Sequence, residues 1–153
     1  MSTLLGLDVG ERRIGVAVGE SRTGLVRPLT TLRRAHPRHD ADSLRVLARD
    51  HGVDELVVGL PLEADGSEGP QALATRVWAA GVEPLLGLAV AWRDERYSSQ
   101  DAEARLGSPR RGRSGGAPSP AALRAYRARV DREAAALILA AELAARSALG
   151  GSD

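Results

Sequence analysis

The sequence predicts one α/β domain, built on a mixed five-stranded sheet flanked by helices, and three observations lead to this prediction. Two apolar segments near the N-terminus are separated by a short turn that begins with Gly, which is the pattern of a β-hairpin. Helix-like and strand-like segments then alternate, which is typical of parallel strands joined by helices. The chain has 153 residues without an internal repeat or an interdomain linker, so residues 1–153 are expected to form a single domain.

The expected strands follow the apolar segments in order. The first three are joined by short turns and should form an antiparallel meander, to which the last two add parallel strands. The fourth is apolar throughout, as expected of a strand that is buried on both faces. The five segments are residues 4–9, 13–18, 26–32, 56–60 and 85–92.

The expected helices are residues 40–51, 70–80, 98–106 and 120–147. Asp40 begins the first, and Pro occupies the first turn of the second and the fourth, where its missing N–H costs nothing. Residues 107–118 are rich in Gly, Pro, Ser and Arg and are expected to form a flexible basic loop. Residues 148–153 are expected to be a disordered tail.

The composition excludes several classes of protein. The chain contains no Cys, which excludes disulfide scaffolds, thiol catalysis and thiolate metal sites. Its apolar runs are shorter than the roughly 20 residues that cross a bilayer, so no membrane association is expected. The N-terminal apolar stretch lacks a basic flank and includes Asp8, unlike a secretory signal. We therefore expect a cytoplasmic protein.

The basic residues are unevenly distributed along the chain. The net charge is only +1, and all 21 basic residues are Arg, a bias that a genome rich in G and C would explain. Codon bias does not explain why eight of them lie between Arg105 and Arg132, with Asp131 as the single acid. Such a cluster predicts an anion-binding surface, and nucleic acid is the commonest large anion. The expected phosphate contacts are Arg110, Arg111, Arg113, Arg124 and Arg127. Aromatic residues make up only 3%, which argues against base stacking as the main binding mode.

Three carboxylates stand in places that a purely structural chain would rarely give them. Asp8 lies within the first apolar strand, Glu95 directly follows the fifth, and Asp131 lies on the small, apolar stripe of the last helix. The two strand ends and the inner face of the helix can meet at one edge of such a sheet. Converging carboxylates without Cys or a suitably placed His favour a hard cation such as Mg²⁺ or Mn²⁺.

Each of these acids also has a purely structural interpretation. Asp8 would accept hydrogen bonds from the turn amides that follow it, at Gly10 or Glu11. Glu95 would pair with a neighbouring Arg, at position 93 or 96. Asp131 would pair with Arg127 across one helical turn.

Four blocks of sequence, in order along the chain, resemble the signatures of the YqgF/RuvX family. The first joins LGLDVG at residues 5–10 to RIGVAV at 13–18, and the second joins VGLP at 58–61 to DGS at 65–67. The third is DER at 94–96 with the serines at 98–99, and the fourth is Asp131 with AA at 134–135 and IL at 138–139. The chain departs from the family pattern at Gly19-Glu20, where Ser-Asp is usual, and at Ala140, where Gln is frequent.

The resemblance implies an RNase H-like fold and a metal-dependent nuclease. Asp8, Glu95 and Asp131 match the family's catalytic acids and would hold two Mg²⁺ ions about 3.5–4 Å apart. Arg96 would contact the scissile phosphate, with pairing to Glu95 as the alternative. The expected reaction is hydrolysis of phosphodiester bonds during 5′-end processing of pre-16S ribosomal RNA. Some family members are described instead as Holliday junction resolvases.

Two other functions compete with this one. Actin-like and sugar-kinase phosphotransferases begin with a similar Asp-x-Gly hairpin, but they need two related domains, which 153 residues do not supply. A non-catalytic ribosome-assembly factor would bind RNA through the same arginines. The sequence leaves open whether the substrate is RNA or DNA, and it leaves open the oligomeric state, a homodimer included.

Overall fold

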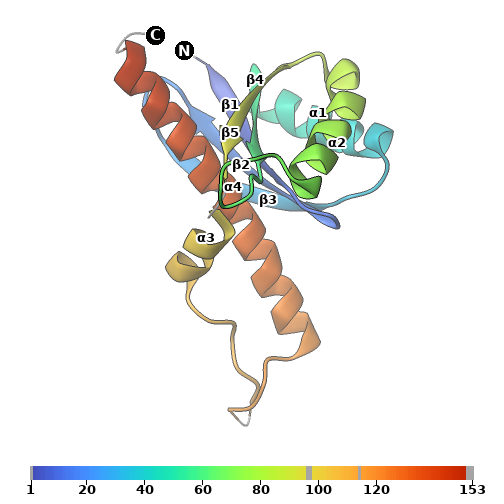
Figure 1. Ribbon diagram of the computed structural model, residues 1–153. Coiled ribbons are helices and arrows are strands. Elements are labelled where there is room, and N and C mark those ends of the chain that lie inside the picture. The colour runs from blue at the N-terminus through green and yellow to red at the C-terminus, as the bar shows by residue number, and fades with distance from the viewer. Residues whose placement is uncertain (1, 96–97, 114, 151–153) are drawn as a thin grey trace.

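The computed structural model describes residues 2–95, 98–113 and 115–150 (Figure 1). The strands are β1 (Thr3–Val9), β2 (Arg13–Glu20), β3 (Val26–Arg33), β4 (Glu55–Leu60) and β5 (Ala89–Asp94). The helices are α1 (Pro37–His51), α2 (Pro70–Leu86), α3 (Ser98–Leu106) and α4 (Pro120–Gly150). In the described part of the chain, no helix is long and apolar enough to cross a membrane.

The strands form one sheet in the order β3-β2-β1-β4-β5. β1, β2 and β3 pair antiparallel as a meander, and β4 and β5 extend the sheet with parallel pairing. The predicted mixed five-stranded sheet is therefore confirmed. β1 lies at its centre, so a residue at the end of β1 has strands on both sides.

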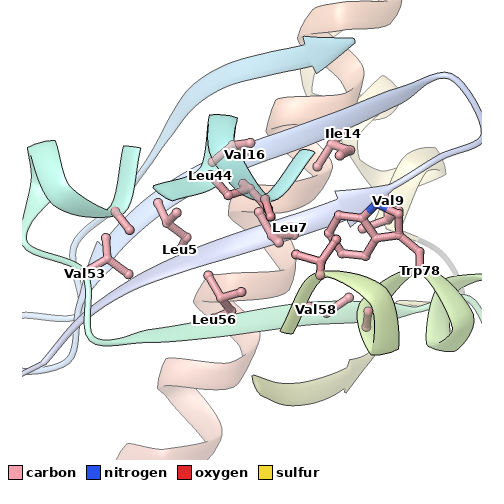
Figure 2. Close-up of a cluster of buried hydrophobic side chains, with 14 of the residues drawn as sticks. Leu5, Leu7, Val9, Ile14, Val16, Leu44, Val53, Leu56, Val58 and Trp78 are labelled. Carbon is pink, nitrogen blue, oxygen red and sulfur yellow. The ribbon is translucent and has the colours of Figure 1, made fainter. Parts of the chain in front are cut away.

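One face of the sheet is covered by α1 and α2 (Figure 1). Figure 2 shows the large side chains beneath them, including Leu5, Leu7, Val16 and Val58, all of which are fully buried. Trp78 of α2 closes this core. It donates its indole N–H to Asp40 of α1 at 3.0 Å, so a buried carboxylate and a buried donor satisfy each other.

The opposite face of the sheet is covered by α4 (Figure 1), where Leu4, Ala17 and Val57 form a second core with the helix and glycines lie beside them. A Cβ added to Gly6 would lie 2.7 Å from Leu139 Cβ, and one added to Gly15 would lie 2.0 Å from the Asp131 carbonyl oxygen. Glycine is needed at both positions because the α4 backbone lies directly against the strands. Thr31 of β3 adds a hydrogen bond to the Ala128 carbonyl at 2.6 Å, which fixes this part of α4.

Several boundaries differ from those expected. The end of α2 was expected near Gly81, but the helix continues to Leu86 because Val82 is buried in the core. Gly81 instead allows close approach, since a Cβ there would lie 3.2 Å from Pro37 Cβ. This extension displaces the start of β5 from Leu85 to Ala89.

α1 and α4 are also longer than expected. α1 begins at Pro37 rather than at Asp40, because the His36 side chain accepts a hydrogen bond from the His39 amide and caps the helix earlier. α4 continues through residues 148–150, which we expected in the tail. Residues 151–153 of that expected tail lie outside the described residues.

The part of α4 that precedes Ala128 extends beyond the sheet, with α3 beside the helix (Figure 1). Ala102 of α3 and Val130 and Ala134 of α4 form a small separate core between the two helices. Arg105 and Glu133 add an ion pair at 3.4 Å. α3, the loop that follows it and the part of α4 before Ala128 therefore form an arm next to the carboxyl end of β1.

Candidate active site

Asp8 is placed by strand alternation on the face of the sheet that α4 covers. Its neighbours Leu7 and Val9 point into the core under α1 and α2, so Asp8 points the other way. On β2 it lies opposite Gly15, whose missing side chain leaves room for α4. The Gly10 amide, which we considered as a partner of Asp8, donates to the Arg13 carbonyl at 2.8 Å.

Glu95 is held by its backbone at the junction of three elements. Its amide donates to the Leu60 carbonyl at the end of β4 at 3.1 Å, and its carbonyl accepts from the Ser98 amide at the start of α3 at 3.0 Å. A Cβ on Gly59 would lie 2.9 Å from Glu95 Cδ, so this glycine makes room for the carboxylate to lie across β4. The residue is only 8% exposed.

The carboxyl groups of Asp8 and Glu95 meet in a side-chain hydrogen bond. Burial, and after it the Asp8 charge, raises the pKa of Glu95 from 4.5 to about 9. Burial also raises the pKa of Asp8 from 3.8 to about 6, although the Glu95 hydrogen bond and the Arg13 charge act in the opposite direction. At neutral pH, Glu95 therefore remains protonated and donates a hydrogen bond to the ionised Asp8 carboxylate.

Asp131 projects from α4 toward the same place, and its partner is Arg13 of β2. Arg13 Nε donates to Asp131 Oδ2 at 2.5 Å, and the Asp131 side chain is 19% exposed. The structural alternative of a pair between Asp131 and Arg127 is therefore not what the structure shows. The Asp131 charge still reaches Asp8, whose pKa it helps to raise.

The three carboxylates line one hollow of about 430 Å³. Its other walls include Gly10 from the hairpin turn, Arg34 after β3, and Pro70 and Gln71 at the start of α2. Among the described residues, no three His, Cys, Asp or Glu side chains are gathered closely enough to hold a metal ion as they stand. Asp8 and Glu95 form the close pair, and Asp131 is the third acid beside it.

Of the arginines predicted to contact phosphates, Arg110, Arg111 and Arg113 lie in the exposed loop between α3 and α4. Arg124 and Arg127 are exposed on α4, where the helix extends beyond the sheet. These five residues thus lie on the arm. Arg96, the sixth, lies outside the described residues.

Sequence reasoning missed two arginines at this site, Arg13 and Arg34. Arg34 lines the hollow and donates to the Gly10 carbonyl at 2.8 Å. A signal for Arg13 was available, because side chains alternate along a strand and the hairpin register pairs Asp8 with Gly15. Two residues before Gly15, Arg13 must point to the same face as Asp8.

Comparison with known proteins identifies the family of this chain. The model of the family described as "RuvX: Holliday junction resolvase" matches residues 2–145. The chain belongs to the RuvX family. The predicted family and the predicted nuclease class are thereby confirmed.

Curated relatives of this RuvX protein include one from Anaeromyxobacter sp. (strain K) that is named "Putative pre-16S rRNA nuclease". The two are 43% identical over 135 residues, which cover 88% of this chain and 91% of the relative. A relative of the same name from Paracoccus denitrificans (strain Pd 1222) is 44% identical over 101 residues, 66% of this chain and 64% of its own.

The fold is that of RuvC. A structure of T. thermophilus RuvC in complex with a Holliday junction substrate aligns with a TM-score of 0.51 at 17% identity. The alignment covers 97% of this chain and 96% of the RuvC chain. The expected RNase H-like architecture is confirmed by this match.

Proposed function

We propose that this RuvX protein is a metal-dependent endonuclease that hydrolyses phosphodiester bonds in structured nucleic acid, and that its substrate is the 5′ leader of pre-16S ribosomal RNA. The observation that carries the proposal is the convergence of Asp8, Glu95 and Asp131 on one hollow beside a basic arm. The names of the curated relatives favour the ribosomal RNA substrate. We propose a cytoplasmic location as well, because that is where this substrate would be processed.

The donor set fits a hard divalent cation such as Mg²⁺ or Mn²⁺. All three acids offer only oxygen ligands, which these cations prefer. The raised pKa values of Asp8 and Glu95 mean that two adjacent buried carboxylates are costly to ionise together. A bound cation would remove this cost and take the place of the shared proton.

When bound, divalent ions supply an activated water and stabilise the leaving oxygen in an in-line displacement. Asp8 is central, because it interacts with both Glu95 and Asp131, and Glu95 must release its proton before it can ligate. Arg13 keeps the Asp131 carboxylate oriented through its Nε hydrogen bond. Arg34, at the wall of the hollow, is positioned to attract a substrate phosphate.

A direct test compares cleavage of a pre-16S 5′ leader RNA with cleavage of a four-way DNA junction. We expect Mg²⁺-dependent cleavage that Asp8→Asn lowers a hundredfold or more, on the order of 3 kcal/mol in the barrier, while binding survives. Asp50→Asn is the matched control, because Asp50 is exposed at the end of α1 and does not line the hollow. If the wild-type protein binds the RNA but does not cleave it, the protein is instead a non-catalytic RNA-binding factor.

The DNA junction is a second candidate substrate, favoured by the family description and by the fold match to RuvC. A four-way junction needs two symmetric cuts, so this alternative requires a homodimer. Preferential cleavage of the junction, by a protein that sediments as a dimer on it, would replace the ribosomal RNA substrate.

The basic arm is proposed to bind flanking phosphates. Replacing Arg110, Arg111 and Arg113 together by Ala should flatten the salt dependence of binding by about 0.7–0.9 log units for each phosphate that these side chains neutralise. Binding is measured by fluorescence anisotropy between 50 and roughly 200 mM salt, the range in which such electrostatic binding dominates. An unchanged slope would show that these arginines do not contact phosphates and are only solvent-exposed side chains of the loop.

A further inference from the structure

A second and larger hollow adjoins the candidate active site. It has a volume of about 810 Å³ and lies between α3, the loop that follows it and the N-terminal half of α4. Ser99, Gln100 and Asp131 line both hollows, so the two form one continuous depression. Sites for small ligands typically measure about 300–1,000 Å³, so this volume suits a group of nucleotide size.

An aromatic ring in a fixed orientation forms part of its wall. Tyr126 is half-buried on α4, and its hydroxyl donates to the Gly107 carbonyl at 2.7 Å. The ring also packs against the small core between α3 and α4. Arg129 lies over it, with its guanidinium carbon 5.9 Å from the ring centroid. A ring held in this way stacks on a base with little loss of side-chain entropy.

The polar groups of the hollow suit the other parts of a nucleotide. Arg13 and Arg127 supply positive charge for a phosphate. The Gln100 amide can donate to and accept from a base edge, and the Glu103 carboxylate accepts from exocyclic amino groups. Arg13 also pairs with Asp131 at the boundary between the two hollows, so a phosphate that reaches Arg13 lies next to the carboxylates.

We propose that the second hollow holds one unpaired nucleotide of the substrate strand, adjacent to the bond that the carboxylates cleave. Its base stacks on Tyr126, and its phosphate lies against Arg13 and Arg127. This inference rests on the proposed nuclease function and adds a selection rule to it. A base inside a continuous duplex is stacked on its neighbours and is not free to enter, so the site favours loops, ends and branch points.

The test moves one abasic site, nucleotide by nucleotide, through a fluorescein-labelled 5′ leader RNA and, in a second series, through a four-way DNA junction. Dissociation constants are measured by anisotropy in a chelator, so that no strand is cut. For the wild-type protein, we expect roughly a tenfold loss of affinity at one position only, the size of a single stacking interaction. Tyr126→Leu should bind the intact strand about tenfold more weakly than the wild-type protein does. An abasic site at the sensitive position should then cause no further loss of affinity.

Two more variants separate the ring from its surroundings. Tyr126→Phe keeps the ring and loses only the hydrogen bond to Gly107, so it should keep the sensitive position. Ala104→Trp fills the hollow from α3 and should abolish that sensitivity even if Tyr126→Leu is poorly folded. A wild-type profile without a sensitive position, or one whose sensitive position persists in Ala104→Trp, overturns the inference.

This scan measures binding, whereas the proposed nuclease function is tested by cleavage with Asp8→Asn. A sensitive position without cleavage would support the nucleotide site and contradict the nuclease. Cleavage without a sensitive position would do the reverse. Failure to bind either nucleic acid would overturn the nucleotide site directly.

Discussion

Beside the candidate active site, the two faces of the sheet carry side chains of very different size. Toward α1 and α2, the central strands present Leu7, Val16 and Val58, which are fully buried beneath the two helices. Toward α4, the neighbouring positions on the same strands are Asp8, Gly15 and Gly59, with glycines or a carboxylate in place of aliphatic side chains. Adjacent residues of a strand thus face different surroundings. One side chain packs in a hydrophobic core, and the next position lies close to the α4 backbone.

The difference shows that, near the carboxylates, the face under α1 and α2 supplies hydrophobic burial and the face under α4 supplies close approach. Farther along the strands, α4 packs on a second core that includes Leu4 and Val57. Large aliphatic side chains keep α1 and α2 at the usual distance of a packed layer and supply the greater share of apolar burial. Glycines let the backbone of α4 reach β2, so that the short side chain of Asp131 arrives beside Asp8. At these positions the α4 face buries less hydrophobic area, and the space left by the glycines allows the carboxylates to come together.

The largest effect should follow from Gly15→Ala. The new Cβ would lie 2.0 Å from the Asp131 carbonyl oxygen and 2.9 Å from the Arg132 amide nitrogen, so α4 must move away. We expect a loss of about 3 kcal/mol in the free energy of unfolding, at the upper end of overpacking costs. Cleavage should fall by a hundredfold or more in the protein that remains folded.

Urea unfolding and single-turnover cleavage measure the two effects of Gly15→Ala. Gly150→Ala is the control, because nothing lies within 4 Å of a Cβ at that end of α4. Normal cleavage by a folded Gly15→Ala protein would show that the close approach of α4 is not needed.

Val16→Ala tests the opposite face with a change at the adjacent residue. Removing two methyl groups from a fully buried side chain should cost about 2 kcal/mol in stability, from reduced burial and the small cavity left behind. Cleavage per folded molecule should stay the same, because α4 and the carboxylates do not move. If Val16→Ala lowers cleavage as much as Gly15→Ala does, the two faces do not differ in their importance for cleavage.

Arg13→Gln tests the ion pair on the α4 face. The Arg13 side chain is 37% exposed, so its pair with Asp131 should contribute no more than about 1 kcal/mol to stability. Cleavage should fall about tenfold, because the Asp131 carboxylate loses the group that orients it. Arg45→Gln is the matched control on the other side of the molecule, where Arg45 pairs with Asp42 of α1 at 2.6 Å. It should change stability by a similar amount and leave cleavage unchanged.

The metal-free protein should also show a pH dependence of stability. The pKa values of Asp8 and Glu95 are raised to about 6 and about 9, so the folded state binds these protons more tightly than the unfolded state. Their stabilising contribution is complete below about pH 4 and is lost as the pH rises through 6 and 9. We expect the Tm in a chelator to be clearly higher at about pH 5.5 than at about pH 8.5.

Glu95→Gln should reduce this pH dependence, because Gln does not titrate and still donates a hydrogen bond to Asp8. Scanning calorimetry in a chelator measures both proteins. A wild-type Tm that rises over the same pH range would show that the two carboxylates do not dominate the balance.

Local patterns predicted the sheet and the positions of two of the acids. The hairpin, the alternation of segments and the apolar fourth strand are short-range signals, and they predicted the correct order of strands and helices along the chain. Asp8 and Glu95 follow from the same signals, because each lies at the end of a strand that the pattern locates. The structure brings their carboxyl groups together in a hydrogen bond.

The local patterns did not predict interactions between segments that are distant in the sequence. Arg13 and Asp131 are 118 residues apart, and a helical-wheel argument favoured Arg127, which is only one turn away. Gly81 was expected to mark a helix end, although it allows the close approach of Pro37 from another helix. Glycines within strands were the unused signal, since they often mark the close approach of another backbone.

The uninterrupted course of α4 constrains how this chain can vary. One helix carries Arg127 on the arm, Asp131 at the carboxylates and Arg146, which pairs with Glu55 of β4 near the far end. Inserting or deleting a single residue between Arg127 and Asp131 would rotate the arm by about 100° relative to the sheet. The loop between α3 and α4 is not helical, so a change in its length does not rotate the arm. Differences in length among related chains should therefore accumulate in that loop and be absent from the stretch between the arm and the β4 ion pair.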